Sequence, residues 1–335
     1  MKHLSVLDPT PMSEGQSAAD ALSETRSLAG LTDALGYCSY WVQEHHNTVS
    51  FAGTAPEILI ADLAARTDRI KLGSGGVMLP NYSPLKVAEQ FLTLSALHPG
   101  RIELGIGRAT GADPRTSAAL LGPGAQAFPT MFQLLKDWLL DGAEQVQLPA
   151  DHRASGVYAR PHARLPDLWL LASSTESAAY AGAVGVKLAF AEFLSPTGAG
   201  DAIAAYQAAF SPSSFCAEPY AAIGTVVLAA ESEDVARQES RVTLAWNIAR
   251  ASGRFTPFPT PDEADRLIAD TDMSTVAALR QRSLSGSADH VADALHQHLT
   301  RIRADEAFVL TISATPEARL TSYRLLMEAW QDLAD

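Results

Sequence analysis

Cysteine is scarce in this chain, with only Cys38 and Cys216 among 335 residues. A disulfide framework in a chain of this length needs more than two cysteines, so none is expected. A free cysteine that is not reactive usually behaves as a small apolar side chain in the core. We therefore expect two structural thiols in a reducing compartment, which is the cytoplasm.

Positive charge and long apolar runs are scarce as well. There are 25 Lys and Arg residues against 38 Asp and Glu residues, which gives a net charge of -13. Binding to nucleic acid needs a cationic footprint, which this composition does not offer. The apolar runs are shorter than the roughly 20 residues that span a bilayer, and "MKHLSVLDPTPM" lacks the apolar core of a signal peptide. We expect a soluble cytoplasmic protein with no nucleic-acid or membrane partner.

Several catalytic motifs are missing too. No G-x-S-x-G elbow occurs, which argues against a serine hydrolase. The segment "ELGIGRATGAD" fails the dinucleotide spacing, because the third glycine position is Thr110 and Gly111 comes one residue late. A metal site needs ligands from several strand ends. Only one predicted strand end carries histidine, so we expect no metal.

Eight short apolar runs alternate with longer helical patterns. Continuous apolar runs, rather than alternating ones, are typical of parallel strands that are covered on both faces. Eight strand–helix units predict a (β/α)₈ TIM barrel, which at this length forms a single domain over residues 1–335. The predicted strands are His3–Leu7, Ser39–Gln43, Ile70–Ser74, Ile102–Ile106, Leu168–Ala172, Lys187–Phe190, Ile223–Leu228 and Ala307–Thr311.

Helix ends and two insertions complete the predicted outline. Gly36 is expected to end the first helix, and Thr54 to cap the second in a capping box with Glu57. Unusually long segments occupy about residues 110–166, after the fourth strand, and about 251–286, before the eighth. Long segments in compact domains are usually functional. We expect both to roof the active-site end of the barrel.

Catalytic residues of such barrels follow the carboxyl ends of the strands. Glu44, His45 and His46 come directly after the second strand. They can be a solvated strand end, or one histidine can act as a general base or hydrogen-bonding group. The residues alone leave both interpretations open.

Three further strand ends suggest a ligand with a flat ring and a phosphate. Gly75 and Gly76, after the third strand, leave backbone open to close approach by a ring, although a tight turn would also use them. Arg108, after the fourth strand, is a planar cation suited to anions. The hydroxyl cluster Ser173, Ser174, Thr175 and Ser177 begins a helix after the fifth strand. It favours a phosphate site over simple capping.

These motifs together resemble the luciferase-like flavin monooxygenases, the superfamily of bacterial luciferase. The similarity extends along nearly the whole chain. It is most specific in the combination of "EHH", "SGGVMLPNYSP" and "HPGRIELGIGRATG", and it returns in "LWLLASSTESA". The resemblance implies the same (β/α)₈ barrel, with FMN or a related deazaflavin bound at the strand ends.

The resemblance also implies roles for individual residues. His45 corresponds to the active-site histidine, with Glu44 or His46 orienting it. Gly75 and Gly76 correspond to a non-prolyl cis peptide beneath the flavin. Gly107 and Arg108 correspond to a flavin-contacting strand end. The phosphate-binding helix start corresponds to Ser173, Ser174 and Ser177.

The implied reaction is monooxygenation with reduced FMN as a diffusible co-substrate. A separate reductase would supply the reduced FMN. Molecular oxygen would give a flavin hydroperoxide that oxygenates a small organic substrate. Secondary metabolism is a setting in which such a reaction is expected. A homodimer is implied by resemblance alone. The alternatives are a deazaflavin-dependent oxidoreductase and a non-catalytic flavin-binding partner subunit. His45 disfavours the last, because such a subunit has no need of the active-site histidine.

Overall fold

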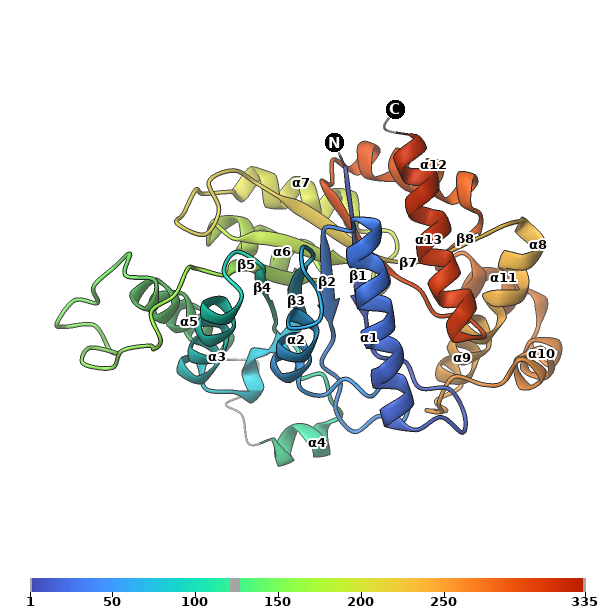
Figure 1. Cartoon of the computed structure of the whole chain (residues 1–335), viewed down its shortest axis with the longest axis horizontal. Coiled ribbons are helices and arrows are strands. Elements are labelled where there is room, and N and C mark those ends of the chain that lie inside the picture. Colours follow the sequence, from blue (N-terminus) through green and yellow to red (C-terminus); the bar gives the residue numbers. More distant parts are fainter. Residues whose placement is uncertain (1, 121–126, 334–335) are drawn as a thin grey trace.

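The computed structural model describes residues 2–120 and 127–333 and shows a closed parallel barrel (Figure 1). Eight strands pair in the order β1-β2-β3-β4-β5-β6-β7-β9, and β9 pairs with β1 to close the ring. This confirms the predicted (β/α)₈ barrel and all eight predicted strands. The barrel strands are β1 (His3–Asp8), β2 (Ser39–Val42), β3 (Lys71–Met78), β4 (Ile102–Gly107), β5 (Asp167–Ala172), β6 (Lys187–Ala191), β7 (Ala221–Ala230) and β9 (Glu306–Leu310).

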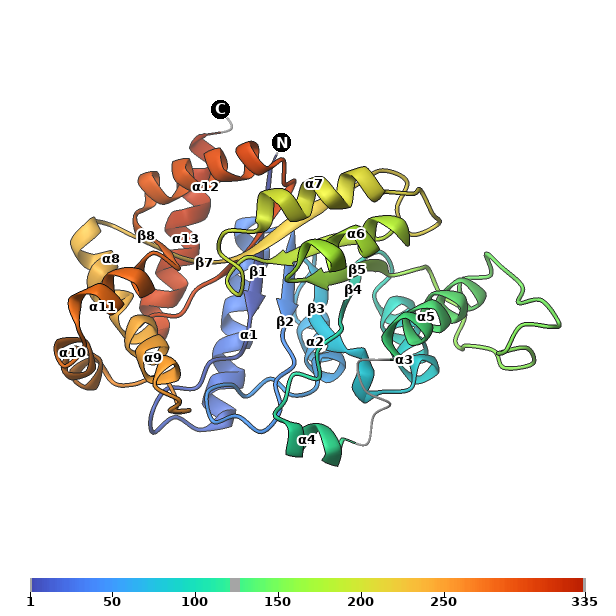
Figure 2. The same ribbon diagram turned by 180° about the vertical axis from the view of Figure 1, so that it is seen from behind.

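Helices surround the barrel and connect successive strands. Figure 2 shows α6 and α7 lying side by side over the β5–β6 side, where the two helices pack against each other. The helices are α1 (Ala18–Leu35), α2 (Pro56–Ala64), α3 (Pro84–Leu97), α4 (Pro114–Ala119), α5 (Phe128–Gly142), α6 (Thr175–Ala183), α7 (Ala199–Ala209), α8 (Glu233–Glu239), α9 (Arg241–Ala251), α10 (Pro261–Ala269), α11 (Met273–Arg280), α12 (Ala288–Ile302) and α13 (Pro316–Asp332), with a short 3₁₀ turn η1 (Leu79–Asn81).

The segment between β7 and β9 is helical and also holds a ninth strand. It contains α8 to α12, and β8 (Leu284–Ser287) pairs in parallel with the last residues of β7, outside the closed ring. The sequence analysis missed β8 because Leu284 is its only large apolar residue. The sequence predicted a long insertion at residues 251–286. In the structure this segment forms the helices α10 and α11 and most of the accessory strand β8.

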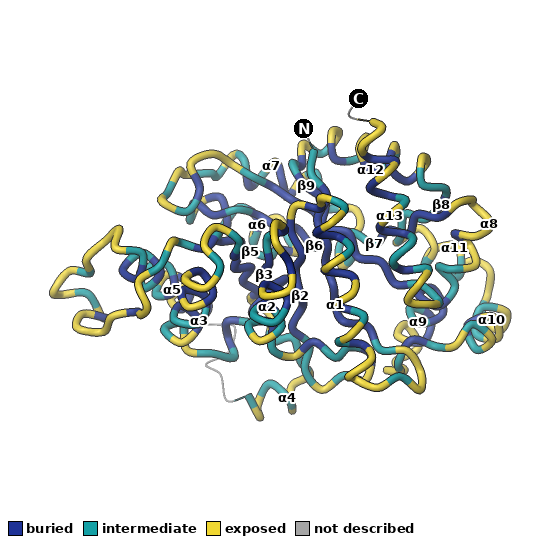
Figure 3. The backbone as a smooth tube through the Cα atoms, viewed as in Figure 1, coloured by how far each residue is buried: buried dark blue, intermediate teal, exposed yellow. Residues whose placement is uncertain are grey.

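The segment after β4 has two parts with different positions. The short helix α4 lies at the end of the barrel where the strands terminate, whereas residues 143–166 extend outward past α5 (Figure 1). These residues are mostly exposed (Figure 3). They join the end of α5 to the start of β5, which lies at the opposite end of the barrel from the active site. The expectation that the whole of 110–166 roofs the active site is therefore wrong for residues 143–166.

The predicted end of the first helix is confirmed, whereas the predicted cap of the second helix is wrong. Gly36 follows α1 in the left-handed conformation, at φ 88°, and α1 begins with a capping box between Ser17 and Asp20. The predicted capping box of Thr54 and Glu57 is wrong, because the N-cap residue of α2 is Ala55, which makes no side-chain cap. Pro56 nevertheless occupies the first turn of α2, where proline is well tolerated. Within residues 2–120 and 127–333, no helix has the length and apolarity to cross a bilayer.

Two buried carboxylates face each other inside the barrel, near the start of the strands. The Ser5 hydroxyl and the Tyr220 hydroxyl, at 2.9 Å, both donate to Glu306. The indole of Trp41 donates to Glu103 at 2.7 Å. Burial, followed by the charge of Glu103, raises the pKa of Glu306 to about 7. Glu306 therefore stays protonated in the folded protein under conditions where an exposed glutamate is ionised.

This raised pKa predicts that Glu306 makes stability fall as pH rises. Between its ordinary value of 4.5 and about 7, the unfolded chain loses the proton that the folded chain retains. Over that interval wild type should lose about 3 kcal/mol of unfolding free energy relative to Glu306→Gln. Urea unfolding of both proteins at several pH values measures the difference. Parallel stability curves from pH 4.5 to 7 would contradict the raised pKa.

Candidate active site

The carboxyl ends of the strands surround an apolar centre. Leu7, Trp41 and Phe308 belong to one buried cluster that fills the barrel interior, and Trp41 and Phe308 pack with ring centroids 4.0 Å apart. The cluster continues toward the strand ends through the partly buried Phe51 and Trp246. The site is therefore built on a dry floor, with polar groups confined to its rim.

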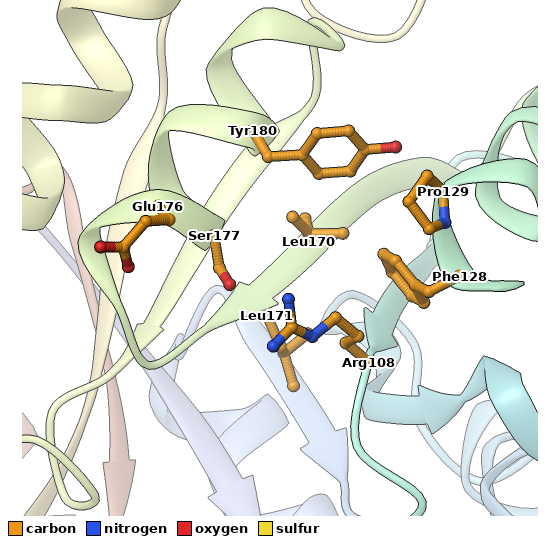
Figure 4. A pocket seen from close by; sticks show the side chains of 8 residues that line it. All are labelled: Arg108, Phe128, Pro129, Leu170, Leu171, Glu176, Ser177 and Tyr180. Atoms are coloured by element: carbon orange, nitrogen blue, oxygen red, sulfur yellow. The ribbon is translucent and has the colours of Figure 1, made fainter. Parts of the chain in front are cut away.

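A pocket of about 520 Å³ opens between the ends of β4 and β5 and the start of α6 (Figure 4). Arg108 and Ser177 both line it, and the Ser177 hydroxyl points toward the Arg108 guanidinium. The structure thus brings together the predicted cation and one predicted serine. The remaining walls are largely apolar and come from α5, β5 and α6; they comprise Phe128, Pro129, Leu170, Leu171, Glu176 and Tyr180.

The other two predicted serines take different positions. Ser174 is the N-cap of α6, and its side chain accepts from the Ser177 backbone N–H at 3.3 Å. Ser173 is exposed, and its carbonyl accepts from the Ser195 hydroxyl at 2.9 Å. Only Ser177 of the three lines the pocket. Ser174 therefore caps the helix, and of the three serines only Ser177 is placed to meet a molecule in the pocket.

The glycines predicted to follow the third and fourth strands lie within β3 and at the end of β4, where they are tightly packed. The Gly75–Gly76 peptide bond is cis, as the resemblance implies. A Cβ at Gly76 would lie 2.6 Å from the Gly105 carbonyl oxygen, which is backbone and cannot move aside. A Cβ at Gly107 would lie 2.7 Å from the Met78 sulfur. These glycines permit close approach between neighbouring strands.

Glu44 is completely buried and ties the end of β2 to the end of β3. One carboxylate oxygen accepts from the Met78 backbone N–H at 2.9 Å, and the other from the Tyr82 hydroxyl at 2.9 Å. That second oxygen is also 2.7 Å from His46 Nε2 and accepts weakly from Asn81 at 3.4 Å. The hydrogen bonds of Glu44 thus orient His46 and the turn after β3. No bond from Glu44 or His46 to the His45 ring occurs in the described chain, so the orienting role suggested for them lacks a contact.

His45 lies over the ring of Phe51, with centroids 4.6 Å apart. Its Nδ1 is buried and has no hydrogen-bond partner among the described residues. Burial, followed by the charges of Arg250 and His46, lowers the pKa of His45 to about 4. The ring is therefore neutral at physiological pH and can donate one hydrogen bond and accept another.

The sequence analysis missed the aromatic wall beside His45. Trp246 of α9 stacks on Phe258 at 4.8 Å, and Phe51 contacts both rings at 5.7 and 5.9 Å. The sequence patterns did not single out Phe51 or Trp246. One signal was available: Trp246 and Arg250 are four residues apart, a spacing at which two side chains on a helix meet.

Comparison with known proteins decides the family. The sequence model of the luciferase-like monooxygenases matches residues 1–306. The chain belongs to the luciferase-like monooxygenase family. The uncharacterized protein YwcH of Bacillus subtilis is 39% identical over 338 residues, covering 99% of this chain and 100% of the relative. N-acetyl-S-alkylcysteine monooxygenase of the same organism is 32% identical and covers 98% of both chains. The solved structure of apo-MsnO8 has 35% identity and a TM-score of 0.88 over 99% of both chains.

More distant solved structures share the fold of this luciferase-like monooxygenase. The oxygenating constituent of 3,6-diketocamphane monooxygenase from Pseudomonas putida, in complex with FMN, has 17% identity and a TM-score of 0.71 over 98% of both chains. An F420-dependent secondary alcohol dehydrogenase has 15% identity and a TM-score of 0.66, over 98% of this chain and 99% of that one. Membership of this family makes the protein a flavin-dependent monooxygenase.

Proposed function

We propose that this protein is the oxygenating component of a two-component system. It would take reduced FMN from a separate reductase and use molecular oxygen to oxygenate a small organic substrate. The observation that carries the proposal is the pocket in which Arg108 and Ser177 meet, at the strand ends of a barrel whose third strand holds the cis Gly75–Gly76 peptide. A homodimer and a cytoplasmic location are part of the same proposal, from family resemblance and composition respectively.

The pocket fits the phosphate of FMN. Arg108 is exposed and offers a planar set of N–H donors, and Ser177 adds a hydroxyl from the first turn of α6. The free N–H groups at a helix N-terminus favour an anion in the same place. We assign Arg108 and Ser177 to the phosphate, with Ser174 holding the start of α6 and Ser173 on the exposed rim.

We place the flat ring of the flavin next to this pocket. The cis Gly75–Gly76 peptide lies there in β3, and Leu7, Trp41 and Leu171 line an apolar hollow around Gly75. A ring that lies there has its phosphate-bearing tail toward Arg108. This supports a flavin as the group bound, and the short, single-cation pocket favours FMN over a deazaflavin with a longer charged tail.

The protein's contribution to the reaction is a dry, oriented site. When bound, reduced FMN supplies the activation of oxygen. The apolar floor and the aromatic wall exclude water from the reacting groups. His45, kept neutral by burial, supplies a hydrogen bond or carries a proton at its free Nδ1. Glu44 and His46 act indirectly by fixing the turn that positions these elements.

Anaerobic titration with photoreduced FMN, followed by stopped-flow mixing with oxygenated buffer, tests the proposal. Saturable binding should be followed by a return of oxidised-flavin absorbance that is slower than in free solution. A substrate panel of thioethers, aldehydes and aromatic compounds, with product analysis by mass spectrometry, should give one product carrying an atom of labelled oxygen. Reoxidation as fast as that of free FMN, or hydride transfer from a reduced deazaflavin without oxygen consumption, would overturn it.

The phosphate assignment gives a separate prediction. Arg108→Met should weaken reduced FMN binding about tenfold, because one charge-assisted contact to the phosphate is lost. Riboflavin, which has no phosphate, should bind wild type and variant with similar affinity. Arg153→Met, a change at an exposed arginine on the 143–166 segment, is the matched control. An equal loss for FMN and riboflavin would place the phosphate elsewhere.

A further inference from the structure

Arg250 is held above the rings of the aromatic wall. Its guanidinium lies 4.7 Å from the centre of the Trp246 ring and 5.7 Å from that of Phe255. Arg250 is exposed, and Phe255 is 71% exposed. Within the described chain no carboxylate lies within ion-pair distance of Arg250, although the protein carries 13 more acidic than basic residues. The guanidinium thus remains available to an anion from solution.

The wall connects this guanidinium to His45. Arg250 contacts Trp246, Trp246 contacts Phe51, and Phe51 lies against the His45 ring. The charge of Arg250 is near enough to contribute to the lowered pKa of His45, after burial. An apolar molecule lying along Phe51 and Trp246 would therefore have one end at His45 and the other at Arg250.

Backbone hydrogen bonds fix the wall in place. Phe258 exchanges two bonds with the segment after β1, donating to the Met12 carbonyl and accepting from the Glu14 N–H, both at 2.9 Å. The Ser50 hydroxyl donates to the Thr256 carbonyl at 2.8 Å, and the Trp246 indole N–H lies 3.2 Å from both groups. The ring that supports Arg250 is thus held from both sides, which lowers the entropic cost of binding against it.

We propose that Arg250 selects the substrate, by binding a carboxylate at the far end of an apolar molecule whose body lies along Phe51 and Trp246. A guanidinium presents parallel N–H donors that match a carboxylate, and one guanidinium matches a monoanion. This inference rests on the proposed function, because it assigns a substrate class to the same site. It makes the reaction an oxygenation of an apolar carboxylic acid at the end remote from its carboxylate.

Phenylacetate and its neutral isostere phenylacetamide test the inference by calorimetric titration of the flavin-free protein. Wild type should bind phenylacetate about tenfold more tightly than phenylacetamide, which corresponds to one charge-assisted contact. In Arg250→Met the two affinities should agree within about twofold, because methionine keeps an apolar stem over Trp246 without the charge. Arg250→Lys should restore part of the preference.

Arg266→Met is the matched control, since it removes an exposed positive charge from α10, which packs against α9. It should keep the wild-type preference. Equal binding of acid and amide by wild type, no saturable binding of phenylacetate, or a preference that survives in Arg250→Met would each overturn the assignment. The titration measures only binding to the flavin-free protein and does not depend on flavin or oxygen chemistry. A negative result therefore argues against the role of Arg250 without bearing on FMN-dependent oxygenation.

Discussion

The Glu44→Ala variant is expected to lose about 3–5 kcal/mol of unfolding free energy, a large share of the stability of a typical domain. Glu44 is fully buried and accepts from the Met78 backbone, Tyr82 and Asn81, with His46 at 2.7 Å. Alanine leaves those groups without their acceptor and also leaves a cavity. The loss is large because one carboxylate satisfies groups from two strand ends.

Urea unfolding followed by circular dichroism measures this loss. Glu44→Gln keeps the side-chain volume and one acceptor oxygen, but its NH₂ group faces hydrogen-bond donors and cannot accept from them. We therefore expect an intermediate loss of unfolding free energy, about 1–3 kcal/mol. Glu57→Ala is the control, because Glu57 is only partly buried and accepts a single bond from Gln90, at 3.2 Å. It should cost less than about 1 kcal/mol. A loss that small in Glu44→Ala would show that Glu44 does not hold the two strand ends together.

The second large effect is expected at His45. His45→Asn should lower the oxygenation rate at saturating substrate by about 100-fold or more, a typical contribution of a placed proton-transferring group. Binding of reduced FMN should change less than about threefold, because the proposed phosphate site is formed by Arg108 and Ser177. The measurement uses the member of the substrate panel that turns over fastest, under single-turnover conditions.

The pH dependence tests whether the ring of His45 is neutral in the folded protein. The folded pKa of about 4 keeps the imidazole neutral above about pH 5, so this group should give no inflection in the rate near its ordinary value of 6.5. The unfolded chain takes up a proton below 6.5 that the folded chain refuses, so stability should fall as pH drops from 6.5 to 4. A wild-type rate that rises through an inflection near pH 6.5, lost in His45→Asn, would contradict the buried, neutral ring.

Most of the barrel could be predicted because its strands carry their own signal. β4 and β9 are buried at every residue, and such continuous apolar runs are readable in one sequence. β8 could not be predicted in the same way, because a short strand with one large apolar side chain forms only through its pairing with β7. The start of α2 was misplaced by one residue, since Thr54 is a good cap by type but the chain turns at Ala55.

The candidate site also has residues that the sequence could predict and residues that it could not. Arg108 and Ser177 could be predicted because parallel strands end at one edge of a barrel, so residues that follow neighbouring strands meet. The bonding of Glu44 to the turn after β3 and the edge-on packing of Phe51 against Trp246 could not be predicted. The first depends on which way a side chain turns, and the second joins residues almost 200 positions apart. Such contacts are set by packing between segments and leave no local pattern.

The pairing of β1 with β9 has a consequence for synthesis. His3 is in register with Glu306, Ser5 donates to Glu306, and Asp8 is 2.8 Å from Arg319. Nearly the whole polypeptide must therefore leave the ribosome before the first strand finds its second neighbour. Until then β1 exposes an unpaired edge and Asp8 lacks its arginine. The nascent chain should depend on chaperones late in translation. Truncations that remove β9 and α13 should leave β1 as an unpaired edge strand that promotes aggregation.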